Sequence, residues 1–139
     1  MRLGLRLFIL IAAVIGAGLM ATVFAAEAAD QATQQVAGGG VTVTATLLKE
    51  QADGTAIQLA LNTHSVNLDT YNFGESTTLR DDSGRVYPVE AVEKASGGGH
   101  HRQTVLRFAK LNPNVKAIEL IVKDVAGVKE WIFRWDVAQ

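Results

Sequence analysis

Three histidines and one arginine are the side chains whose types and positions best fit binding chemistry. His64 lies in the segment NTHSVNL, and His100, His101 and Arg102 follow three glycines in SGGGHHR. Imidazole is a common ligand of zinc and of Cu(II), and three nitrogen donors, or two with a carboxylate, make a workable ligand set. The histidines are therefore a candidate site for zinc or Cu(II).

Two other roles fit the same residues. Adjacent side chains on a regular strand point to opposite faces, so His100 and His101 can converge on one ion only where the glycines make the backbone irregular. In the second role, a histidine at a strand end pins a loop by bonding a backbone carbonyl, and Arg102 pairs with a carboxylate from Asp69, Glu75 or Asp81. In the third, Arg102 and loop amides hold an anion or a small polar ligand.

Several common chemistries lack their residues. The chain has no cysteine, and both methionines, Met1 and Met20, lie near the N-terminus, so blue-copper, iron–sulfur and Cu(I)–methionine centres are excluded from the rest of the chain. No serine stands in a G-x-S-x-G pattern, and Ser83 reads as part of a turn. The neighbouring Asp81 and Asp82 are expected to be solvated or to cap that turn. The sequence predicts a protein that is not an enzyme.

The N-terminus has the layout of an export signal. Arg2 and Arg6 precede an uncharged run from Leu7 to Ala26, followed by small residues. We predict a signal peptide over residues 1–28, or an uncleaved membrane anchor of about the length that spans a bilayer. Either places the remaining chain outside the cytoplasm: periplasmic, secreted, or anchored and facing outward. The formal net charge of −1 gives no indication of nucleic-acid binding.

The remaining chain has the pattern of an all-β domain. Residues 29–40 are small and polar and predict a flexible linker, so the folded domain is expected over residues 41–139. Apolar residues then recur with period two, as they do on one face of a strand. Strands are predicted in 41–50, 56–64, 65–69, 103–111, 116–125 and 128–137, and two more within 76–92. Trp131, Phe133 and Trp135 share one face of the last strand and are predicted core residues.

Seven or eight short strands separated by turns are typical of an immunoglobulin-like antiparallel β-sandwich. We therefore predict this fold class, preceded by the N-terminal signal or anchor helix. The elements THSV, LRDD-x-G and GGHHR, at their separations here, resemble those of a group of uncharacterised exported β-sandwich domains of bacteria and archaea. The resemblance covers most of residues 41–137 and implies the same immunoglobulin-like fold, without implying an activity.

The favoured functional hypothesis is a non-enzymatic exported binding module of the cell envelope, which binds a transition metal through its loop histidines. The alternative is a structural or assembly protein, whose tether and sheet edges join it to a protein partner or to copies of itself. The only expected contact with a membrane is through the N-terminal segment, if that segment is uncleaved.

Overall fold

The computed structural model describes residues 32–48 and 54–137 of the chain. Within these ranges, nine strands form two antiparallel sheets. Their bounds are β1 Thr33–Gly38, β2 Val41–Leu47, β3 Thr55–Thr63, β4 Thr77–Asp81, β5 Val86–Pro88, β6 Ala91–Gly98, β7 His101–Phe108, β8 Ala117–Val125 and β9 Val128–Asp136, with a short helix α2 at Phe73–Ser76. The predicted signal or anchor helix lies outside the described residues. In the described ranges no helix is long and apolar enough to cross a membrane.

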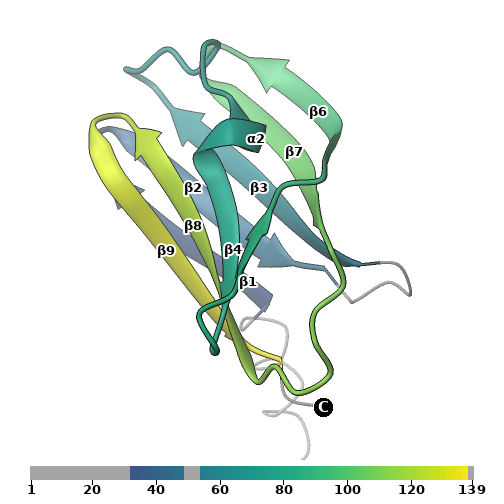
Figure 1. Cartoon of the computed structure of the whole chain (residues 1–139). Coiled ribbons are helices and arrows are strands. Elements are labelled where there is room, and N and C mark those ends of the chain that lie inside the picture. The colour runs from purple at the N-terminus through teal and green to yellow at the C-terminus, as the bar shows by residue number, and fades with distance from the viewer. Residues whose placement is uncertain (1–31, 49–53, 138–139) are drawn as a thin grey trace, which may run out of the picture.

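The two sheets form the layers of an all-β sandwich (Figure 1). One sheet has the order β1-β2-β3-β7-β6, and the other has the order β5-β4-β8-β9. The chain passes from one sheet to the other after β3, after β5 and after β7. Neighbouring loops at the ends of the sandwich therefore come from distant parts of the sequence.

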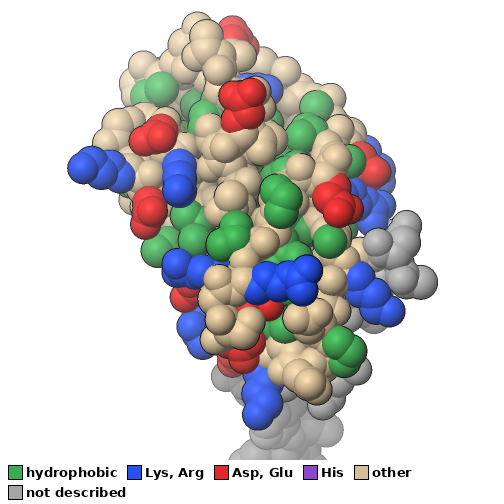
Figure 2. Space-filling model, in the orientation of Figure 1, with side chains coloured by type: hydrophobic (Ala, Val, Ile, Leu, Met, Phe, Trp, Pro, Cys, Tyr) green, Lys and Arg blue, Asp and Glu red, His purple; other side chains and the backbone are tan. Residues whose placement is uncertain are grey.

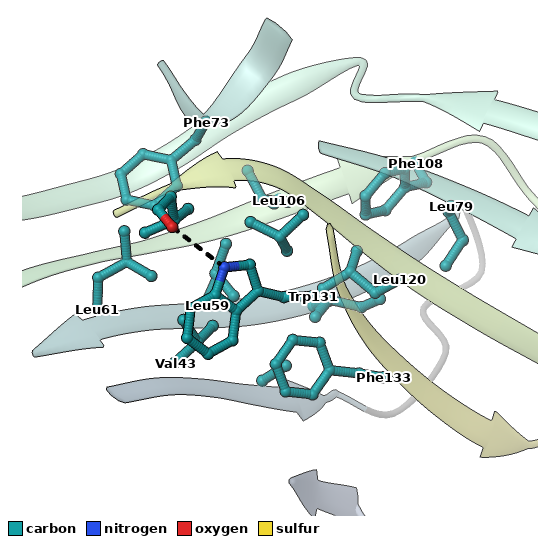
Figure 3. Close-up of a cluster of buried hydrophobic side chains, with 14 of the residues drawn as sticks. Val43, Leu59, Leu61, Phe73, Leu79, Leu106, Phe108, Leu120, Trp131 and Phe133 are labelled. Atoms are coloured by element: carbon teal, nitrogen blue, oxygen red, sulfur yellow. Dashed lines mark hydrogen bonds between the residues drawn. The ribbon is translucent and has the colours of Figure 1, made fainter. Parts of the chain in front are cut away.

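The core is built from the alternate side chains that the period of two predicts. Trp131, Phe133 and Trp135 are 3%, 0% and 4% exposed, which confirms the predicted inner face of β9. Figure 3 shows Trp131 and Phe133 near Val43 and Leu59 of the other sheet. The Trp131 indole N–H donates to the carbonyl of Val125 at 3.4 Å, so its polar atom has a partner inside the core.

The prediction of a flexible linker over residues 29–40 is wrong from Thr33 onward. Thr33–Gly38 forms the edge strand β1, which pairs with β2 across a two-residue turn at Gly39 and Gly40. Both glycines have positive φ, of 56° and 80°, which is the requirement of a tight hairpin turn. The strand was missed because its residues are mostly exposed and its pairing follows from the turn, so it has no alternating apolar pattern.

Two further segments differ from prediction. Residues 65–69 form no strand, because they belong to the crossover that leads from β3 toward β4 in the other sheet. The hydroxyl of Thr63 instead accepts from the amides of Ser65 and Val66, a local turn. Ala91–Gly98 forms β6, so the first glycines of SGGGHHR end a strand of which only the first two residues were predicted.

Truncation of Phe133 tests this core. Its side chain is fully buried, so Phe133→Ala should lower the free energy of unfolding by about 3–5 kcal/mol. Ile132→Ala is the control, because Ile132 lies on the opposite face of β9 and is 49% exposed, and it should change stability by no more than about 0.5 kcal/mol. Urea unfolding of both variants measures the difference, and equal effects would show that the inner face of β9 is misassigned.

Candidate functional site

Main-chain hydrogen bonds join the histidine-bearing segments at one end of the sandwich. The amide of Thr63 donates to the carbonyl of His100 at 2.9 Å, and the amide of Leu68 donates to the carbonyl of Gly99 at 2.9 Å. The Gly99 amide donates in return to Asp69 Oδ1 at 2.6 Å. The β6–β7 turn is therefore fixed against the crossover that follows β3.

The glycines of SGGGHHR make the β6–β7 hairpin possible. Gly99 and His100 are the two turn residues, and Gly99 has a φ of 59° while His100 keeps a negative φ, the φ pattern of a type II′ turn. Gly97 has a φ of 79°, and a Cβ atom there would lie 2.0 Å from the carbonyl oxygen of His101. His101 follows the turn as the first residue of β7 and lies opposite Asn62 of β3.

His64 and His101 form an exposed pair. Their ring centroids are 6.4 Å apart, and the rings are nearly perpendicular, at 87°. Nδ1 of His101 is hydrogen-bonded to Oδ1 of Asn62 at 2.7 Å. Two of the three predicted ligands are thus brought together, from the end of β3 and the start of β7.

The structure does not place all three histidines around one point. His100 occupies the turn, and its ring makes no hydrogen bond or ring contact with another described residue. In residues 32–48 and 54–137, no group of three or more His, Cys, Asp or Glu side chains is placed to hold a metal ion. A protein-only site of three ligands is therefore not preformed in this part of the chain.

Arg102 binds backbone rather than a carboxylate. Its Nη1 donates to the carbonyl of Leu68 at 2.8 Å and to that of Tyr71 at 2.6 Å. The guanidinium lies 4.6 Å from the centroid of the Phe73 ring, a cation–π contact. No ion pair joins it to a carboxylate in the described ranges, so the expected partners Asp69, Glu75 and Asp81 are not its partners.

Asp81, the first residue of the adjacent carboxylate pair, organises a turn. Its Oδ1 accepts from the Ser83 amide and hydroxyl and from the Arg85 amide, and its Oδ2 accepts from the Tyr87 hydroxyl at 2.9 Å. The hydrogen bond from Ser83 holds the pKa of the Asp81 carboxyl below its ordinary value. Asp82 is exposed and accepts from the Lys116 amide. The pair thus has the turn-capping geometry considered from the sequence.

No protein-family model matches the chain, and comparisons with curated proteins and with solved structures find no match. The geometry of the loop end is therefore the basis for the functional inference below.

Asn62 is the residue of this site that the sequence analysis missed. Its position opposite His101 depends on the register between β3 and β7, two strands that are distant in the sequence. The available signal was weak: Asn62 lies two residues before His64 and on the exposed side of an alternating strand. Only the strand order makes it a neighbour of His101.

A substitution at Gly97 tests the hairpin geometry. Gly97→Ala should destabilise the protein by more than the roughly 1–2 kcal/mol that a left-handed backbone costs an ordinary residue, because its Cβ also meets the His101 carbonyl. Gly99→Ala is the matched control, since its φ is also positive but no atom lies within 4 Å of its added Cβ. Urea unfolding should give a lower free energy of unfolding for Gly97→Ala than for Gly99→Ala. The reverse order would contradict this turn geometry.

Replacement of Asp81 gives a pH-dependent test. The lowered pKa means that the carboxylate stabilises the fold above its unfolded-state pKa of about 3.9, and that this contribution is lost as pH falls through the lower folded-state pKa. The melting temperature of Asp81→Asn should therefore lie below that of the wild type at pH 5–7, with the gap closing below about pH 4. Asp82→Asn should show little change, and a gap for Asp81→Asn that is constant with pH would refute the linkage.

Proposed function

We propose that the chain is a non-enzymatic exported binding module of the cell envelope, with an immunoglobulin-like fold, which binds a zinc or Cu(II) ion at its loop end. The observation that carries the proposal is the exposed His64–His101 pair, held at that end by main-chain hydrogen bonds between segments distant in sequence. Export is supported by the signal layout of residues 1–28, and the absence of enzymatic function by the missing nucleophile patterns of the sequence.

The strand order supports the immunoglobulin-like assignment. Without β1, the sheets have the orders β2-β3-β7-β6 and β5-β4-β8-β9. If β2 is strand A, these are the orders A-B-E-D and C′-C-F-G, which correspond to the two sheets of immunoglobulin-type sandwiches. The histidine end then carries the B–C, D–E and F–G loops, and β1 is an additional strand before A.

The histidines are better suited to ligand binding than Arg102 is. Both hydrogens of Arg102 Nη1 are used by backbone carbonyls, and one face of the guanidinium lies over Phe73. By contrast, the His64 ring makes no hydrogen bond or ion pair within the described residues, and its ring contact there is with His101. Arg102 therefore fits the loop-pinning role, which leaves the imidazoles for the ligand.

The sheet edges bear on the alternative, a structural or assembly protein. Strand β6 has a register shift next to Lys94, whose φ is 51°, and β5 has three residues and ends at Pro88. In β9, the backbone of Arg134 is bound by the side-chain amide of Gln34. Bulges, lysine, proline and covered backbone are features by which proteins protect edges from pairing. These observations favour the binding module over assembly through sheet edges.

Analysis of the protein recovered from its native envelope tests the proposed function. We expect an intact mass with the N-terminus between Ala25 and Asp30, a sedimentation coefficient independent of concentration, and close to one zinc or copper per chain by elemental analysis. Recovery from the cytosol would refute export. Metal-free protein whose mass rises with concentration would favour the assembly alternative.

A further inference from the structure

The structure assigns a two-histidine metal site to His64 and His101, with Asn62 as the residue that positions His101 and with His100 outside the site. This inference deepens the proposed function, since it names the ligands at the same loop end. It differs from the sequence hypothesis, in which all three histidines were candidates.

The separation of the rings is close to that of two ligands of one ion. With a Zn–N bond of about 2.0–2.1 Å and a tetrahedral angle, the centroids of two imidazoles on one ion lie roughly 5–5.5 Å apart. The observed 6.4 Å is about 1 Å wider. Both side chains are exposed, so the rings have room to rotate toward each other when an ion binds.

Asn62 favours the tautomer of His101 that a metal ligand needs. The amide oxygen Oδ1 is only an acceptor, so Nδ1 of His101 is the donor in the 2.7 Å bond. In neutral imidazole the proton on Nδ1 leaves a lone pair on Nε2, which is free to bind a cation. Histidine ligands commonly donate their second N–H to such an acceptor, which fixes ring orientation and raises the basicity of the ligating nitrogen.

The backbone around the pair is already ordered. The carbonyl of His100 accepts from Thr63, directly before His64, so one hydrogen bond fixes the two backbones that carry the rings. Gly97 lacks a Cβ atom, so the carbonyl oxygen of His101 can lie close to its backbone, as this hairpin requires. Because the backbone of both histidine segments is already fixed, metal binding costs the chain little conformational entropy.

Open coordination positions follow from having two protein ligands. A zinc ion bound by four ligands would keep two places for water or for a small donor molecule. A hollow of ≈ 180 Å³, lined in part by Asn62, Gly97 and His101, lies beside the site. Since water occupies about 30 Å³ per molecule in the liquid, this hollow has room for such exogenous ligands.

Metal titration of matched histidine variants tests the assignment. The exported protein, stripped with a chelator, would be titrated with Zn(II) and with Cu(II) by calorimetry. Loss of a supporting hydrogen-bond partner typically weakens metal binding about 10–100-fold, and loss of a ligand should weaken it at least as much. We therefore expect His64→Ala and His101→Ala to lose at least about tenfold in affinity, and His100→Ala, the control, to bind within about twofold of the wild type.

Asn62 variants and a spectroscopic readout separate ligation from a structural effect. Asn62→Leu should weaken binding about 10–100-fold, whereas Asn62→Asp, which keeps an acceptor for Nδ1, should restore it. Electron paramagnetic resonance of the Cu(II) form should show coupling to two imidazole nitrogens in the wild type and in His100→Ala, and to fewer in His64→Ala. Circular dichroism confirms that each variant is folded.

Two results would overturn the assignment: equal loss of affinity in all three histidine variants, or Cu(II) spectra that do not depend on His64 and His101. Metal in the envelope protein together with either result would leave the proposed function standing and remove only this ligand set. Conversely, pair-dependent binding in vitro with no metal in the envelope protein would establish the site and refute its proposed use.

Discussion

The guanidinium of Arg102 is the contact on which the loop end depends. The segment between β3 and α2 leaves one sheet for the other, so its carbonyls have no neighbouring strand to bind them. Unpaired backbone groups are costly when they are shielded from water, and Arg102 binds the carbonyls of Leu68 and Tyr71 from β7 of the five-stranded sheet. Its planar group also stacks on Phe73, a geometry that a lysine could not reproduce. The crossover is thereby held beside the β6–β7 turn.

Asp81 has the corresponding role near the opposite end, where β8 begins. Its carboxylate binds three groups of the β4–β5 turn and the hydroxyl of buried Tyr87. Burial raises the pKa of that hydroxyl, and so does the hydrogen bond to Asp81. At each end of the sandwich an ionised side chain thus binds an irregular segment, while apolar side chains fill the interior. On the outer face of the four-stranded sheet, charged and apolar side chains are interspersed (Figure 2), and Arg80 and Arg134 both pair with Glu119.

The sequence predicted those parts of the fold that depend on alternation. The strands with inner apolar faces, such as β3, β8 and β9, are recognisable because burial on one face imposes a period of two. Strand β1 has no such face, and β6 contains a bulge and glycines, so their pairing depends on turns and on partners. The histidine loops could be located by type, but which rings meet depends on register. The predicted carboxylate partners of Arg102 are wrong because every residue has a backbone carbonyl, and the sequence does not show which carbonyls need a donor.

The side chain of Gln34 binds the backbone of Arg134, and the indole of Trp135 donates to the carbonyl of Ala32 at 3.0 Å. These contacts join residues about a hundred positions apart, whereas β1 and β2 form a local hairpin. Closing so large a loop has an entropic cost. Topologies rich in distant contacts fold slowly for this reason. The hairpin of β1 and β2 can form early, but its outer edge stays open until β9 has docked. We therefore expect the first strand of the described residues to gain its last contacts only after the last strand has formed.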